Sequence, residues 1–172
     1  KANTRVISGD EITFLSILIT KYNDNCNKSF SEPVSILAKK LLSEYLIYSS
    51  SKFIAINKPP GLAVQGGSKI NLSIDEALSY LNQEGGHKYK IVHRLDKDTS
   101  GILLIAKGFS NAAILAEAFR KHLMQKTYIA ITSGVPTSSE GTLIHNIGKE
   151  LSGIFQIVKE LKNGGKRAET YY

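Results

Sequence analysis

Three stretches of the chain repeat apolar residues at the three- and four-residue spacing of an amphipathic helix. The first stretch begins at Pro33, and proline is favoured in the first turn of a helix. The second follows Ser73, which forms a capping-box pattern with Glu76, and two glycines end it. The third begins at Ser110, which can cap it, and pairs Glu117 with Lys121 on its polar side. The apolar positions expected to face a core are Val34, Leu37, Ala38, Leu41, Leu42, Tyr45, Ile74, Ala77, Leu78, Leu81, Ile114, Leu115, Ala118, Phe119 and Leu123.

Apolar runs around the second helix predict three strands. The run "SKFIAINKPPG" predicts a strand that ends at its prolines, because proline cannot donate a hydrogen bond to a ladder. The runs "YKIVHRL" and "ILLIAK" predict two more strands, joined by the turn sequence "DKDTSG". The last run is apolar enough to be buried on both faces of a sheet.

The two ends of the chain also contain strand-like segments. Near the start, "EITFLSILIT" predicts a strand at the end of a small domain. Near the other end, "GIFQIVKEL" and "AETYY" predict a hairpin around a glycine turn. Strands outnumber helices without regular alternation, so we predict an α+β fold with a mixed, largely antiparallel sheet and flanking helices. The expected parts are the end of a small domain, a linker with a helix, and a main domain, in residues 1–20, 21–45 and 46–172.

The composition narrows the class of protein. A chain of 172 residues can bury one solid core, and 42% hydrophobic residues is an ordinary content for a globular protein. No apolar run approaches the roughly 20 residues of a membrane span. A single cysteine, Cys26, excludes an internal disulfide, and His87, His122 and His145 lack metal-ligand spacing. With no secretory signal pattern either, we expect a cytoplasmic protein without a membrane partner.

The charge balance favours a polyanionic partner. The chain has 22 Lys and Arg against 15 Asp and Glu, a formal net charge of +7, and its isoelectric point is about 9.4. Such a balance is typical of proteins that bind RNA or DNA, although it occurs in many proteins that bind neither.

Three motifs, in this order along the chain, resemble those of RNA pseudouridine synthases: "FIAINKPPGLAVQGGSKI", "HRLDKDTSGILLIAK" and "MQKTYIAITSGVP". The resemblance implies that Asp96, the aspartate after "HRL", is the catalytic residue. It also implies that Tyr128 is an active-site tyrosine and that Arg94 fills the gap left by an extruded base. The segments "AVQGGS" and "GGKRAETYY" are most similar to a subtype that acts on large-subunit ribosomal RNA.

The same resemblance bears on the two ends of the chain. Residues 1–12 resemble the last part of an S4-type RNA-binding domain, which that subtype carries upstream. The family motif "GRTHQIR", whose first arginine pairs with the catalytic carboxylate, is not found in this sequence. We therefore expect a catalytic domain that is incomplete at its C-terminus.

The chemistry implied by the resemblance needs a carboxylate and no cofactor. Turning uridine into pseudouridine breaks the bond between N1 and the ribose and rejoins the base through C5, without redox change or group donor. An aspartate such as Asp96, with an ordinary pKa of about 3.9, is already ionised at neutral pH and can attack or stabilise the electron-poor sugar. The base must leave its stack, and a tyrosine ring such as that of Tyr128 can stack on it and move the C5 proton. Arg94 can position the carboxylate.

Several residues near the motifs have more than one interpretation. Lysines beside the motif loops can neutralise phosphates, and they are Lys58, Lys69, Lys97 and Lys126. Asn57, Lys58 and Gly61 can instead shape the loop that contains them. His93 is placed as a general base would be, but strand alternation puts it on the opposite face from Arg94, which favours a packed histidine.

Three functions remain open on the sequence alone. Asp96 is either catalytic or a side-chain turn former, the role we assign to Asp98. The favoured hypothesis is a monomeric enzyme that isomerises uridines of large-subunit ribosomal RNA. The alternatives are an inactive RNA-binding remnant or ribosome-assembly factor with the same fold, and a nucleoside-cleaving hydrolase that releases free uracil.

Overall fold

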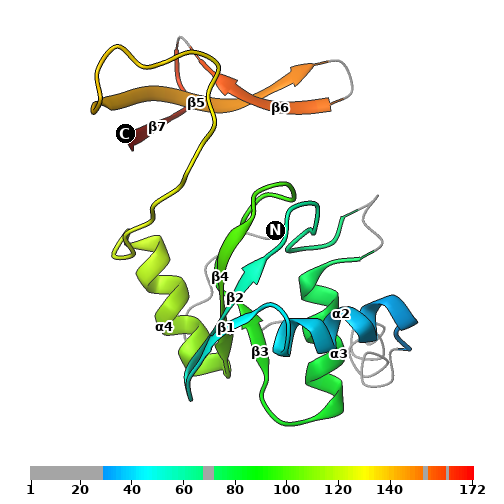
Figure 1. Ribbon diagram of the computed structural model, residues 1–172. Coiled ribbons are helices and arrows are strands. Elements are labelled where there is room, and N and C mark those ends of the chain that lie inside the picture. The colour runs from blue at the N-terminus through cyan, green and yellow to red at the C-terminus, as the bar shows by residue number, and fades with distance from the viewer. Residues whose placement is uncertain (1–28, 68–71, 153–154, 162) are drawn as a thin grey trace, which may run out of the picture. The chain divides into compact units, whose positions relative to one another are not determined.

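A computed structural model describes residues 29–67, 72–152, 155–161 and 163–172. The chain divides into two compact units, Lys1–Gln125 and Lys126–Tyr172, and each has its own sheet (Figure 1). The predicted strand "EITFLSILIT" and the S4-like segment lie outside the described residues. In the part of the chain that is described, no helix is long and apolar enough to cross a membrane.

The first unit contains a four-stranded antiparallel sheet. Its strands are β1 (Leu46–Ser49), β2 (Phe53–Lys58), β3 (Tyr89–Ile91) and β4 (Gly101–Lys107), in the order β1-β2-β4-β3. β4 therefore lies between β2 and β3, and it pairs antiparallel with both. The predicted strands over β2, β3 and β4 are confirmed, but β3 ends at Ile91, earlier than expected, and β1 was not predicted.

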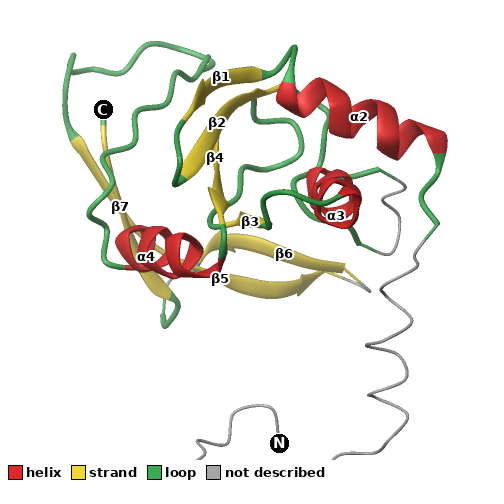
Figure 2. Cartoon of the chain, turned by 90° about the horizontal axis from the view of Figure 1, so that it is seen from below, coloured by secondary structure: helices red, strands yellow, loops and turns green. Residues whose placement is uncertain are grey.

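Two helices cover one face of this sheet and the third helix lies on the other (Figures 1 and 2). The two are α2 (Glu32–Leu42) and α3 (Ile74–Glu84), both at predicted positions. Their apolar sides pack on the sheet and form one core, because alternate residues of β2 and β4 point toward them. The buried members of this core are Leu37, Ala38, Leu41, Ile54, Ile56, Val64, Ile74, Ala77, Leu78, Leu95, Leu103 and Ile105.

The start of α3 holds the loop that follows β2. Ser73 Oγ accepts the Glu76 backbone N–H at 3.3 Å, so the predicted N-cap is confirmed. The first two N–H groups of the helix donate to carbonyl oxygens of that loop, from Ile74 to Ala63 at 3.0 Å and from Asp75 to Val64 at 2.9 Å. The part of the loop around Ala63 is therefore held by the start of α3.

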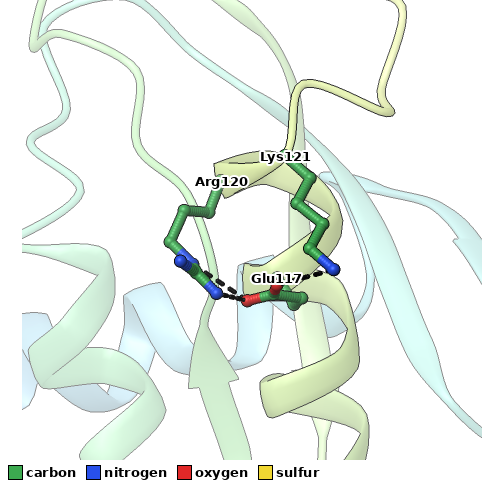
Figure 3. Close-up of polar contacts among 3 residues, drawn as sticks. All are labelled: Glu117, Arg120 and Lys121. Atoms are coloured by element: carbon green, nitrogen blue, oxygen red, sulfur yellow. Dashed lines mark hydrogen bonds and ion pairs between the residues drawn. The ribbon is translucent and has the colours of Figure 1, made fainter.

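The third helix differs from its prediction at its start and in its burial. α4 spans Phe109–Arg120 and follows Gly108, so Ser110 lies inside the helix and does not cap it. None of its residues is buried, and Ile114 is 67% exposed, because only one side of the helix meets β4 and β3. The predicted polar pair is confirmed, with Lys121 Nζ 3.2 Å from a Glu117 carboxylate oxygen, and Arg120 binds the same carboxylate (Figure 3).

The second unit contains a three-stranded antiparallel sheet. Its strands are β5 (Thr142–Ser152), β6 (Phe155–Glu160) and β7 (Lys166–Tyr171), in the order β6-β5-β7. The last two strands were predicted, but the prediction that they form a hairpin is wrong, because each pairs with β5 instead. Overall, the predicted α+β class with a largely antiparallel sheet is confirmed.

Candidate active site

Asp96 lies in an exposed turn between β3 and β4. The turn runs from Asp96 to Thr99 and is closed by the Thr99 N–H, which donates to the Asp96 carbonyl oxygen at 3.1 Å. Within the described ranges, no group hydrogen-bonds the carboxylate of Asp96 or of Asp98. The backbone therefore closes this turn, and the interpretation of either carboxylate as the group that ties it down is wrong. The Asp96 side chain is left facing solvent.

The residue before Asp96 anchors the turn to the core. Leu95 is 7% exposed and belongs to the core cluster, together with Ile56 and Leu103. Its two neighbours, Arg94 and Asp96, are exposed. A buried leucine between two charged residues fixes the backbone locally, because withdrawing it would expose apolar surface. Leu95 thus holds the aspartate at the surface of the first unit.

Lys58 reaches the Asp96 turn from the neighbouring strand. It is the last residue of β2 and lies opposite Gly101, the first residue of β4. Strand alternation puts Lys58 on the same face as Ile54 and Ile56, which belong to the core. Its side chain consequently enters the protein instead of solvent, and the residue is 0% exposed.

The Lys58 ammonium group is held by three backbone carbonyls. Its Nζ donates to the oxygens of Pro59 and Leu62, both at 2.9 Å, and to that of Lys97 at 2.8 Å. An ammonium has three donors, so all of them are used. Two of the bonds shape the loop after β2, and the third joins that loop to the residue next to Asp96. Lys58 therefore fixes the position of the catalytic candidate's turn.

Burial and charge act in opposite directions on this lysine. Loss of water lowers the pKa of Lys58 from its ordinary value of 10.5, while the carboxylates of Asp98 and Asp96 oppose that shift. The prediction that Lys58 contacts RNA phosphates is wrong, because its ammonium is enclosed and fully bonded. The alternative interpretation, that Lys58 shapes its loop, is the one that the contacts support.

His93 is packed in the first unit, as predicted, although it lies after the end of β3 and not within a strand. Its ring stacks on Phe119 of α4, with ring centroids 4.2 Å apart and an angle of 24° between the planes. Its Nε2 accepts the backbone N–H of Leu104 in β4 at 2.8 Å. This nitrogen is therefore occupied and unavailable to take a proton as a general base.

The remaining predicted residues fall into three groups. Arg94 and Lys97 flank Asp96 and are exposed, so both side chains can reach a ligand at this turn. Lys69 lies outside the described residues. Tyr128 and Lys126 belong to the second unit, where both are exposed, and their roles stay predictions.

The arrangement favours chemistry at a single exposed carboxylate. An exposed aspartate on a turn fixed by Leu95 and Lys58 can meet an electron-poor carbon. No group of three or more potential metal ligands occurs within the described ranges. Sequence reasoning missed the structural role of Leu95 and left that of Lys58 as one of two interpretations, although the alternation of Ile54 and Ile56 already places position 58 on the core face.

Comparison with known proteins points to one family. The model of the RNA pseudouridylate synthase family matches residues 52–172. Ribosomal large subunit pseudouridine synthase C of Rickettsia bellii is 46% identical over 180 residues, which cover 100% of this chain and 57% of that protein. The protein of the same name from Escherichia coli is 31% identical and is covered over 52% of its length. The chain thus spans about half the length of the curated relatives that it matches.

Two solved structures share the fold. The human RNA pseudouridylate synthase domain containing 4 superposes with a TM-score of 0.64 at 28% identity, over 81% of this chain and 56% of that chain. The human RNA pseudouridylate synthase domain containing 1 gives a TM-score of 0.55 at 24% identity, over 73% of this chain and 49% of that chain. These matches agree with the mixed helical and antiparallel architecture described above.

Proposed function

Because the chain belongs to the RNA pseudouridylate synthase family, we propose that the full-length protein isomerises uridines of large-subunit ribosomal RNA to pseudouridine. The exposed Asp96 carboxylate, on a turn fixed from the core and from β2, is the observation that carries the proposal. The substrate class rests on relatives at up to 47% identity that are named ribosomal large subunit pseudouridine synthase C. A ribosomal RNA substrate would place the protein in the cytoplasm.

In the proposed reaction, Asp96 acts on the uridine as the N1–C1′ bond opens. Its carboxylate attacks C1′ or the uracil ring, or stabilises the positive charge that develops on the ribose. The freed base turns over, C5 bonds to C1′, the proton on C5 departs and N1 gains a proton. Atoms and electrons balance without an oxidant, a reductant or a group donor.

The residues around Asp96 assist by handling the base and the phosphates. Arg94, exposed beside the aspartate, fills the space that the extruded uridine leaves, which offsets an unstacking cost of a few kcal/mol. The ring of Tyr128 stacks on uracil, an interaction worth about 1–3 kcal/mol, and its hydroxyl moves the C5 proton. Exposed Lys97 and Lys126 neutralise phosphates, so binding weakens steeply with added salt.

The proposal is tested by changing one carboxylate and its neighbour on the same turn. Full-length protein is restored to cells that lack the gene, as wild type, Asp96→Asn or Asp98→Asn, and pseudouridines are mapped in their ribosomal RNA. We expect the modification to vanish only with Asp96→Asn, while the affinity of that variant for RNA stays within about threefold, because a neutral isostere keeps the turn. Modification that persists with Asp96→Asn, or large-subunit RNA that is the same with and without the gene, contradicts the proposal.

A further inference from the structure

The His93 ring takes the place of a backbone acceptor just after the end of β3, where the chain leaves the sheet. The antiparallel register pairs Lys90 with Ala106, and hydrogen-bonded pairs of such a ladder recur at every second residue. The next pair would bring the N–H of Leu104 to the carbonyl oxygen of Val92. That N–H instead donates to His93 Nε2 at 2.8 Å. The backbone therefore turns away from β4 at this point without leaving a strand N–H unsatisfied.

The contacts of the ring define its tautomer and its plane. A backbone N–H can only donate, so Nε2 must offer its lone pair, and the neutral ring carries its proton on Nδ1. Stacking on Phe119, at 4.2 Å between centroids, holds the ring plane against α4. His93 thus links the segment that follows β3 to both β4 and α4.

The turn that carries Asp96 is consequently fixed before and after the aspartate. On one side, His93 is bonded to β4 and Leu95 is buried in the core. On the other side, the carbonyl oxygen of Lys97 accepts the Lys58 ammonium at 2.8 Å. His93 is three residues from Asp96, so a change in where the chain leaves β3 shifts the carboxylate.

We propose that His93 is a positioning residue, whose Nε2 acceptor sets the direction in which the chain leaves β3 and thereby the location of the Asp96 carboxylate. The inference rests on the proposed function. It assigns His93 no contact with the uridine and no proton transfer. Loss of the acceptor should accordingly slow the chemical step more than it weakens RNA binding, because effective catalysis depends on placement of the reacting groups within about an ångström.

Two substitutions separate the acceptor from the ring. His93→Phe keeps an aromatic ring that can stack on Phe119 but has no acceptor, whereas His93→Gln places an amide oxygen near the position of Nε2 and has no ring. In the full-length protein, we expect kcat to fall about tenfold or more for His93→Phe, with KM for RNA within about threefold of wild type. His93→Gln should keep kcat within about threefold of wild type. His87→Phe, at an exposed histidine outside the site, is the matched control.

A measurement without catalysis tests the contact itself. In full-length protein labelled with ¹⁵N-histidine, the His93 ring should give the nitrogen shifts of the Nδ1–H tautomer at neutral pH. An Nε2–H tautomer or a charged ring would overturn the inference, whatever the activity. Equal kcat values for His93→Phe and wild type would overturn it while leaving the proposed function intact. Wild-type protein that shows the expected tautomer but forms no pseudouridine would instead contradict the proposed function, on which the positioning role depends.

Discussion

Replacing Lys58 with methionine should destabilise the first unit strongly. Methionine has a similar length but no donor, so the variant loses the three bonds to Pro59, Leu62 and Lys97. Three bonds from a charged donor are worth about 5–9 kcal/mol before the cost of burying the ammonium is set against them. That cost is several kcal/mol, so it offsets a large part of the gain from the three bonds. We therefore expect the free energy of unfolding to fall by about 2–4 kcal/mol.

Urea denaturation of the full-length protein measures this loss. The matched control is Lys52→Met, because Lys52 directly precedes β2, as Lys58 ends it, but its side chain is exposed. The control should change the free energy of unfolding by less than about 0.5 kcal/mol. A Lys58→Met variant as stable as the control would refute the reasoning, since it would mean that the three carbonyl contacts contribute nothing net.

Three further predictions concern the same unit. The free energy of unfolding of wild type, measured relative to that of Lys58→Met, should rise as the pH increases from 8 to 10.5. The pKa of Lys58 is lower in the folded than in the unfolded protein, so the unfolded state binds more protons in this range. A difference that stays flat across this range contradicts the prediction. Leu95→Ala should cost about 2–4 kcal/mol of stability in urea denaturation and also lower kcat, because Leu95 anchors the Asp96 turn. Ser73→Ala should reduce the free energy of unfolding by about 1 kcal/mol, which a lower midpoint of thermal unfolding would show. Ser110→Ala, inside α4, should change the midpoint little.

Local patterns predicted the elements whose signals lie within a few residues. The α3 helix was expected from its capping residues and its apolar spacing, and Ser73 caps it as expected. Strand β4 was expected from a continuous apolar run, and it occupies the centre of its sheet. α3 buries the side that its pattern indicates, so local and tertiary preferences agree there. The prediction that β4 is buried on both faces is wrong, because its second face is only partly covered and Ile102 is 62% exposed.

Elements that depend on distant partners were not predictable in this way. β6 and β7 are separated by a glycine turn, yet both pair with β5, whose polar residues and Gly148 hide its strand character. β1 is only four residues long, and it begins directly after Tyr45, the last apolar position of the first predicted helix, so its own pattern does not stand out. Pairing between strands depends on packing across the sheet, which short sequence windows do not contain.

The candidate site shows the same division. Asp96 was singled out by the "HRLD" motif together with the residues that follow it and the two flanking motifs, in their order along the chain. The role of Lys58 in holding the Asp96 turn was harder to predict. A lysine is almost never fully buried, so Lys58 was also interpreted as a phosphate contact. Three carbonyls that converge on Lys58 come from two separate loops, and only the folded chain brings them together.

The central claim, that Asp96 drives isomerisation without releasing the base, is tested by following one hydrogen. Full-length protein is incubated with large-subunit ribosomal RNA that carries tritium on C5 of its uridines. Because C5 loses its hydrogen when it bonds to the ribose, wild type should release tritium to water in the same amount as pseudouridine forms, with no free uracil, and Asp96→Asn should release none. Free uracil from wild type, or tritium release by Asp96→Asn at the wild-type rate, would contradict the account.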